Sequence, residues 1–224
     1  EHPVADAAAQ GFVADLLTSP LKAELLQGAA GIACLYTNKD DIDFDSYHQL
    51  IMLGIVDEGI EIPGHCRPFT AADKKDYKKE AHIHFWRRYV AAALNYTLPQ
   101  SPALMQIKVN AEELKQAESI LKPQYHWVAL SRQVISDLKD YALWDEVVDE
   151  LLIREDVGVV LLGDEPMAYR EHPRLVNLMG RTSIDQLKAL ALYCHVVVGV
   201  DGLLTNLGML LATPVVALFS MIDP

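Results

Sequence analysis

The sequence predicts an α/β fold in which parallel sheets are covered by helices. Its second half alternates continuous Val- and Leu-rich runs with stretches of helical periodicity. Runs that are apolar throughout, rather than at every second residue, indicate strands buried on both faces. Strands that alternate with amphipathic helices are typical of a parallel sheet with helices on each side.

The second half has the clearer pattern, in the order strand, helix, strand, long loop, strand, helix, strand, helix, strand. The strands are predicted at 126–130, 157–163, 175–180, 195–200 and 215–219, and the helices at 141–155, 183–194 and 204–212. Trp144, Val148 and Leu152 recur every four residues and define one helix face. Ser183 followed by Gln186 is a capping-box signal for the start of the next helix.

The first half is less regular. Strands are predicted at 11–16 and 31–36, and helices at 19–29, 45–54 and 71–95. The segment 96–110 holds two prolines and little periodicity, which is typical of a linker, and an exposed helix is predicted at 111–121. We therefore expect an N-terminal domain at 1–100 and a second domain at 101–224.

Composition excludes several functional classes. The chain of 224 residues carries 19 Lys and Arg against 31 Asp and Glu, a formal charge of −12. This balance argues against nucleic-acid binding and against broad binding to membrane surfaces. No apolar stretch reaches the ~20 residues of a transmembrane helix, and no signal peptide is recognised. The three cysteines form no Cys-x-x-Cys motif, which fits a reducing, cytoplasmic compartment.

Two further expectations concern metals and chain ends. His82 and His84 are two residues apart and point in different directions on a helix, so no metal site is predicted. The chain begins without methionine and stops directly after a strand-like run. We interpret it as a segment of a longer protein that lacks both ends.

Asp201 and Gly202 stand where a buried strand passes into a helix. Ligands of open parallel sheets bind outside the carboxyl ends of the strands, and a helix N-terminus there offers N–H groups and a partial positive charge to phosphate. Gly202 would allow close approach of a ligand. Asp201 could equally be a helix cap, a position that aspartate favours. Spacing alone leaves both interpretations open.

The segment 177–224, "NLMGRTSIDQLKALALYCHVVVGVDGLLTNLGMLLATPVVALFSMIDP", resembles the C-terminal domain of glycosyltransferase family 9, the ADP-heptose:lipopolysaccharide heptosyltransferases. Family members carry "N-L-x-G-[KR]-T-S" and, after a strand, "G-x-D-[ST]-G-x-x-H-L" followed by "P-x-[VI]-x-L-F-G-P-T-D-P". The matching residues are Asn177, Leu178, Gly180, Arg181, Thr182, Ser183, Leu187, Gly199, Asp201, Leu207, Leu211, Thr213, Pro214, Leu218, Phe219, Asp223 and Pro224. Weaker similarity covers 12–32 and 129–151.

The resemblance implies two Rossmann-like domains of the GT-B type, with the N-terminal domain incomplete in this chain. It implies metal-independent, inverting transfer of a sugar, without a cofactor, from ADP-heptose or another nucleotide diphosphate sugar. The implied acceptor is a lipopolysaccharide-type or lipid-linked glycan. The implied location is the bacterial cytoplasm, at the inner face of the inner membrane, with peripheral membrane contact and no transmembrane segment.

The resemblance also implies roles for particular residues. Lys139 and Asp201 are the catalytic candidates, with Lys139 stabilising the leaving phosphates. The candidates for donor binding are Ser131, Arg132, Lys139, Glu165, Arg181, Thr182, Asp201, Gly202, Leu203 and Asn206. For each there is a plainer interpretation as a solvated loop residue or a helix cap. The basic stretch 74–89 could contact a phosphorylated acceptor or form a solvated helix face.

The sequence departs from the family at the Asp201 motif. Gly202-Leu203 replaces Ser/Thr-Gly, and Asn206 replaces the histidine. The glycine-rich "G-D" turn that opens family members and holds the expected base has no match. These departures keep two alternatives open: a catalytically inactive binding or scaffold module, and another GT-B enzyme such as a nucleotide-sugar epimerase.

Overall fold

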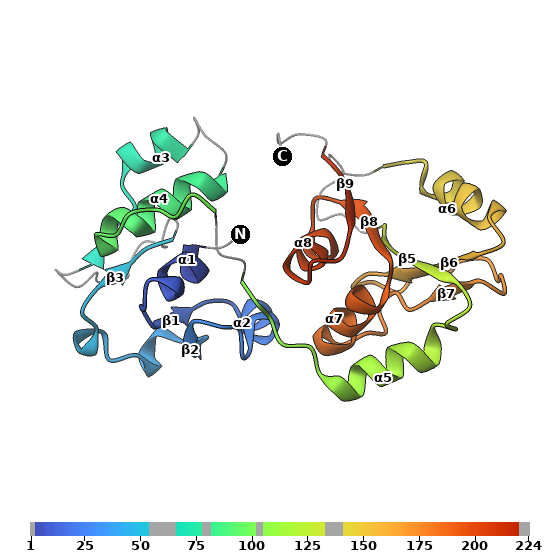
Figure 1. Cartoon of the computed structure of the whole chain (residues 1–224), viewed down its shortest axis with the longest axis horizontal. Coiled ribbons are helices and arrows are strands. Elements are labelled where there is room, and N and C mark those ends of the chain that lie inside the picture. The colour runs from blue at the N-terminus through green and yellow to red at the C-terminus, as the bar shows by residue number, and fades with distance from the viewer. Residues whose placement is uncertain (1–2, 54–65, 78–81, 102–104, 133–140, 220–224) are drawn as a thin grey trace. The chain divides into compact units, whose positions relative to one another are not determined.

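The computed structural model describes residues 3–53, 66–77, 82–101, 105–132 and 141–219. The chain divides into two compact units, Glu1–Ile107 and Lys108–Pro224 (Figure 1). The division between them falls seven residues after the one expected from the linker composition. Each unit is described separately.

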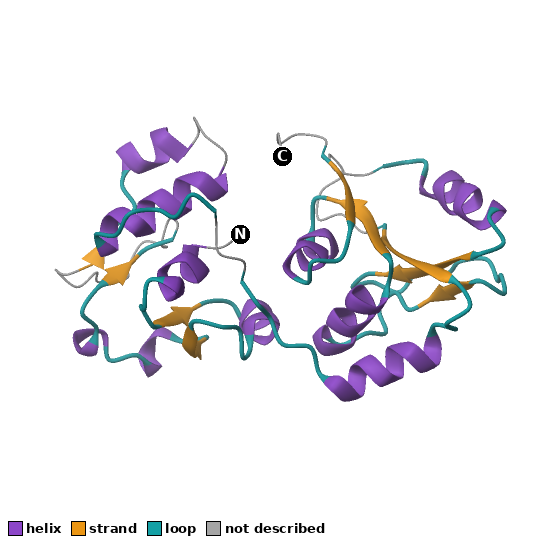
Figure 2. Cartoon of the chain, viewed as in Figure 1, coloured by secondary structure: helices purple, strands orange, loops and turns teal. Residues whose placement is uncertain are grey.

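A five-stranded sheet forms the centre of the second unit (Figure 2). Its strands are β5 (His126–Ser131), β6 (Val157–Leu162), β7 (Leu175–Asn177), β8 (Val196–Val200) and β9 (Val215–Leu218). All pairings are parallel, in the order β7-β6-β5-β8-β9. The helices are α5 (Ala111–Ile120), α6 (Trp144–Ile153), α7 (Ile184–Tyr193) and α8 (Leu203–Leu210). The predicted α/β class and the predicted order of elements are confirmed.

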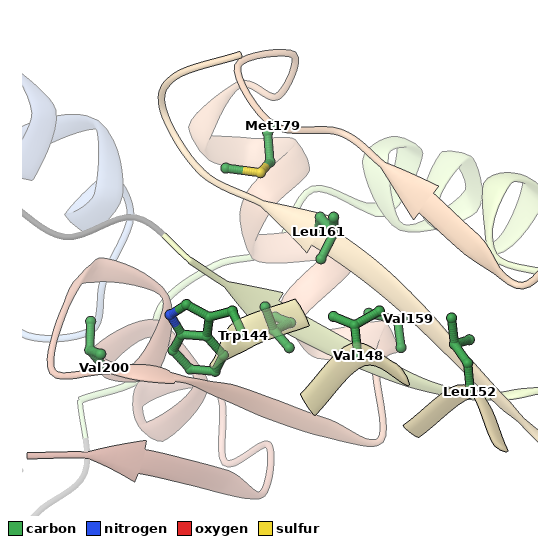
Figure 3. Packing of buried hydrophobic residues seen from close by; sticks show 8 residues of the cluster. Trp144, Val148, Leu152, Val159, Leu161, Met179 and Val200 are labelled. Atoms are coloured by element: carbon green, nitrogen blue, oxygen red, sulfur yellow. The ribbon is translucent and has the colours of Figure 1, made fainter. Parts of the chain in front are cut away.

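Helices cover both faces of this sheet. On one face α6 packs Trp144, Val148 and Leu152 against β5, β6 and β8, and Figure 3 shows this cluster from close by. On the other face α8 approaches Val197 and Val215 closely at Gly208, where an added Cβ would lie 2.8 Å from a Val215 methyl. Val198 packs against the cluster that contains α6, whereas Val197 faces α8. Successive residues of a strand point to opposite faces, so α6 and α8 lie on opposite sides of the sheet.

The interior of the sheet explains why the apolar runs form strands. All six residues of β6 are buried, and the adjacent β5 buries four consecutive residues, 127–130. Trp127 is paired with Gly158 across the two strands, and a Cβ at Gly158 would lie 2.7 Å from the indole ring. The missing side chain therefore makes room for the tryptophan.

The first unit contains two short parallel pairs of strands. β1 (Ala14–Leu17) pairs with β2 (Ile32–Tyr36), and β3 (Leu50–Ile51) pairs with β4 (Cys66–Arg67). Its helices are α1 (Pro3–Ala9), α2 (Pro20–Leu26), α3 (Ala71–Tyr77) and α4 (His82–Leu94), with two 3-10 turns at Lys39–Asp41 and Phe44–Ser46. α1 packs on α4 around a core of Ala7, Phe85, Tyr89 and Val90.

Two expectations for the first unit need correction, and further elements were not predicted. The helix predicted at 45–54 is wrong: a 3-10 turn ends at Ser46 and β3 follows. There Asp43 accepts the backbone N–H of Asp45, and the Ser46 hydroxyl donates to the Asp43 carbonyl, so local side-chain bonds compete with a helix. Within 71–95 the structure describes two helices, α3 and α4, and residues 78–81 between them lie outside the described residues. The helix α1 and the strand β4 were not predicted.

Candidate functional site

The strand order of the second unit defines where a ligand would bind. From β5 the chain proceeds through β6 and β7 to one edge of the sheet, and then returns to add β8 and β9 on the other side of β5. The order reverses between β5 and β8. In open α/β sheets ligands bind at such a switch point, outside the carboxyl ends of the strands.

The residues that end these two strands are predicted site residues. Ser131 is the last residue of β5, and it is paired with Gly199 of β8. Asp201 directly follows β8, and its backbone N–H donates to the Leu218 carbonyl of β9 over 3.2 Å. The parallel register therefore brings Ser131, Arg132 and Asp201 to the same edge of the sheet.

In the turn from β8 into α8, Asp201 is not the residue that caps the helix. The N-cap residue is Gly202, so that interpretation is wrong in its position. The buried Thr205 hydroxyl accepts the Gly202 N–H over 3.1 Å, and it lies 3.0 Å from the Val200 and Gly202 carbonyls, to either of which it can donate. Thr205 holds the turn closed from inside the helix. Leu203 is half-buried and Asn206 is exposed in the first turn of α8.

Arg132 is held by two side chains of the second unit. Its Nη1 donates to Asp145, in the first turn of α6, over 2.7 Å. The guanidinium carbon lies 5.2 Å from the centre of the Tyr169 ring. Burial, together with a hydrogen bond to the Asp145 carboxylate, raises the pKa of Tyr169 to about 12, so its hydroxyl is protonated at neutral pH.

The ends of β6 and β7 form a second part of the edge. The Gly180 N–H donates to the Gly163 carbonyl over 2.7 Å, and the Asn177 side-chain amide donates to the Met167 carbonyl over the same distance. These bonds join the loop that carries Glu165 to the turn that carries Arg181 and Thr182. Ser183 caps α7 in a capping box with Gln186, as predicted, so neither Arg181 nor Thr182 is the cap.

Two further groups of predicted residues belong to other parts of the chain. Lys139 belongs to 133–140 and lies outside the described residues. In the basic stretch 74–89, Arg87 is buried and its Nε donates to Asp6 over 2.5 Å. Arg87 therefore belongs to neither a solvated face nor an acceptor-binding surface, which corrects the expectation for this residue.

Sequence reasoning missed three residues of the edge, namely Asp145, Tyr169 and Thr205. Thr205 stands three residues after Gly202, the spacing of a capping interaction, and this signal could have identified it. Asp145 and Tyr169 lie 13 and 37 residues after Arg132 in sequence, and no local pattern joins them.

The described residues contain neither a metal cluster nor a membrane-spanning helix. Across 3–53, 66–77, 82–101, 105–132 and 141–219, no group of three or more His, Cys, Asp or Glu side chains is placed to hold a metal ion. In the same residues no helix is both long enough and apolar enough to span a membrane.

Numbered along the second unit, the strand order is 3-2-1-4-5, which is the order of a Rossmann-like doubly wound sheet. The sequence profile of glycosyltransferase family 9 (heptosyltransferase) matches residues 64–224. The chain belongs to this family. No curated protein is similar enough to count as a match.

The chain is similar to several solved structures. The structure of E. coli heptosyltransferase WaaC with ADP is 16% identical, with a TM-score of 0.69 over 99% of this chain and 83% of that chain. The glycosyl transferase family 9 protein from Veillonella parvula DSM 2008 is 15% identical, with a TM-score of 0.54 over 63% and 44%. E. coli ADP-heptose lps heptosyltransferase II is 22% identical, with a TM-score of 0.48 over 60% and 46%. This chain therefore spans less than half the length of the last two proteins.

Proposed function

We propose that the chain belongs to a glycosyltransferase that takes a sugar from a nucleotide diphosphate donor, with the donor bound at the carboxyl edge of the second unit. The single observation that carries the proposal is the meeting of Ser131, Arg132, Asp201 and Gly202 at the switch point between β5 and β8. Family membership supports sugar transfer, and the neighbour solved with ADP supports a nucleotide donor.

This edge supplies positive groups for an anionic ligand beside the carboxylates of Asp145, Glu165 and Asp201. The chain has a formal charge of −12, yet Arg132, Arg181 and the N-terminus of α8 all follow strands at this one edge. The first N–H groups of a helix lack intrahelical partners and carry a partial positive charge. Around the glycine N-cap they suit the phosphates of a nucleotide diphosphate.

The proposed reaction is an inverting displacement. An acceptor hydroxyl forms a bond to the anomeric carbon while the bond from that carbon to the diphosphate oxygen breaks. The nucleotide diphosphate leaves with the electron pair, and the hydroxyl proton passes to a base. Negative charge develops on the leaving phosphates, so fixed positive groups there lower the barrier.

The finer assignments are part of the proposal. The donor is ADP-heptose or a related nucleotide diphosphate sugar, and the acceptor is a lipopolysaccharide-type or lipid-linked glycan. The reaction needs no metal and no cofactor, and it takes place at the cytoplasmic face of the inner membrane. Turnover that disappears in EDTA and returns with a divalent metal would contradict the metal-independent part.

A second function is favoured by the sequence around Asp201. Gly202-Leu203 and Asn206 replace the hydroxyl and the imidazole of the family pattern, which removes two groups able to bind phosphate or sugar. We propose as the alternative a nucleotide-binding module without transfer activity. Saturable ADP binding, combined with no release of ADP from ADP-heptose in the presence of acceptor, would favour this alternative.

Isothermal titration calorimetry with ADP and ADP-heptose tests the donor site. We expect saturable binding of both, because the diphosphate is common to them. Absence of binding by any nucleotide diphosphate sugar would overturn the proposal.

Lys139→Ala tests the proposed phosphate contact of this lysine. We expect ADP affinity to fall by about tenfold, the loss of one charge-assisted contact. The control is Lys108→Ala, which removes a lysine at the start of the second unit, away from the strand ends. Unchanged ADP affinity in Lys139→Ala would exclude Lys139 from the site.

A further inference from the structure

Arg132, Asp145 and Tyr169 form a cluster that none of the sequence motifs includes. They come from the end of β5, the first turn of α6 and the loop after β6. Asp145 accepts a hydrogen bond from Arg132 Nη1 over 2.7 Å, and it also accepts the Tyr169 hydroxyl. The Tyr169 ring packs against the guanidinium face at 5.2 Å from its centre, within the range of a cation–π contact.

This geometry restrains the guanidinium in two ways. The carboxylate of Asp145 fixes the direction of one N–H group, and the aromatic ring fixes the plane. Arg132 is largely buried, with a side chain that is 18% exposed, whereas the side chain of Asp145 is 67% exposed. An arginine whose rotamer is already restricted loses less conformational entropy when a ligand binds.

The restraint leaves the Nε of the guanidinium unpaired. Arg132 Nε is buried and has no hydrogen-bond partner, and the same holds for Nε1 of the neighbouring, almost fully buried Trp144. Buried donors normally have partners, and an unpaired one calls for an explanation such as a missing ligand. The Nε edge of arginine is one of the two edges that bind phosphate with two parallel hydrogen bonds.

We propose that Asp145 and Tyr169 are positioning residues that hold Arg132 so that its Nε edge binds the diphosphate of the donor. The inference rests on the proposed donor site and extends it by two residues that do not themselves contact the ligand. Asp145 acts through its hydrogen bond to Nη1, and Tyr169 acts through its ring and through its hydroxyl on Asp145. Arg132 contacts the phosphate.

If Asp145 only stabilised α6, the expected effect of its substitution would differ from that of a positioning residue. Asp145 stands in the first turn of α6, where a carboxylate stabilises the helix through its dipole. That contribution concerns the helix alone and does not depend on the residue at position 132. The positioning role depends on Arg132 entirely, so a double-mutant cycle separates the two.

The experiment measures the Kd of ADP by calorimetry for the unchanged chain, Asp145→Asn, Arg132→Lys and the double variant. We expect Arg132→Lys and Asp145→Asn each to raise Kd by about five- to tenfold. In the Arg132→Lys background, Asp145→Asn should change Kd by less than about twofold, because lysine has no Nε edge for Asp145 to position. Tyr169→Phe, which keeps the ring and removes the hydroxyl, should raise Kd by about two- to threefold.

Asp149→Asn is the matched control. Asp149 lies one turn further along α6, is about as exposed as Asp145, and pairs with Arg170 instead of Arg132. The substitution removes the same charge from the same helix, so we expect the Kd of ADP to stay within about twofold, as for other surface changes outside a site. Thermal unfolding of all variants shows whether each remains folded at the titration temperature.

The possible outcomes separate this inference from the proposed function. If the unchanged chain does not bind ADP, the proposed function fails and the inference fails with it. If the unchanged chain binds ADP and Asp145→Asn binds equally well, only the inference is overturned. Equal effects of Asp145→Asn in both backgrounds, or an equal effect of Asp149→Asn, would also overturn it, because each would show a general effect of the helix charge.

Discussion

At the scale of single residues, Gly180 is needed for two separate reasons. Its φ of +68° lies in the left-handed region that favours glycine. An added Cβ would also lie 2.6 Å from the backbone nitrogen and ring of Pro166. Pro166 follows Glu165, and Arg181 follows Gly180, so this close approach holds two predicted donor-binding loops together.

We expect Gly180→Ala to destabilise the chain more than an ordinary glycine substitution does. The positive φ costs about 1–2 kcal/mol, and the overlap with Pro166 costs a further 1–3 kcal/mol. The control is Gly11→Ala, where φ is +87° but no atom lies within 4 Å of the added Cβ. Urea unfolding of both variants measures the difference, and equal losses of stability would show that the Pro166 contact is unimportant.

At the scale of elements, the turn between β8 and α8 depends on a hydroxyl inside the helix. Thr205 is buried, and it accepts the Gly202 N–H at the N-cap of α8. Since Gly202 has no side chain to accept a bond from the helix, Thr205 is the residue that gives the turn its shape. The conformation of the proposed phosphate-binding amides therefore depends on a residue that faces away from them.

Thr205→Val removes this hydroxyl at nearly constant volume. We expect a loss of about 1–3 kcal/mol, because the Gly202 N–H loses its acceptor, together with weaker ADP binding in calorimetry. Thr213→Val is the matched control: the Thr213 hydroxyl is also buried and donates to the Ala191 carbonyl over 3.0 Å. Thr213 precedes β9 and is therefore away from the carboxyl ends of the strands. It should lower stability similarly and leave ADP affinity unchanged. Equal effects on affinity would show that the turn has no specific role.

At the scale of the whole molecule, each unit has its own core, and the first unit contains a buried ion pair. The side chains of Arg87 and Asp6 are 7% and 0% exposed, and they join α4 to α1. A buried pair of this kind contributes little net stability compared with apolar residues, but the loss of one partner leaves an uncompensated buried charge.

Arg87→Met should therefore destabilise the first unit by about 3–5 kcal/mol. Hydrogen exchange followed by mass spectrometry should show faster exchange in α1 and α4, and unchanged exchange in β5 and β6. Arg88→Met, at the exposed neighbouring position, is the control and should change stability by less than about 0.5 kcal/mol. If β5 and β6 exchange faster by the same factor, the two units do not unfold separately.

The sequence predicted the second unit far better than the first. Each strand and helix there is recognised from periodicity over 5 to 15 residues, and the interior of a parallel sheet makes that periodicity strong. In the first unit, short strands and side-chain bonds such as those of Asp43 weaken the periodic signal, and the helix expected at 45–54 was wrong for that reason. For the site, the strand-end residues Ser131 and Asp201 were recognisable as candidates, whereas Asp145 and Tyr169 were not.

The sequence by itself determined the α/β class, the order of elements in the second unit, and the motif at 177–224 that indicates the family. Only the tertiary structure decided that β5 and β8 are neighbours, that Arg87 is buried against Asp6, and that Arg132 meets Asp145 and Tyr169. The physical reason is the range of the interactions. Periodicity and capping act within a few residues of one another, whereas strand order and side-chain pairing depend on how distant segments pack.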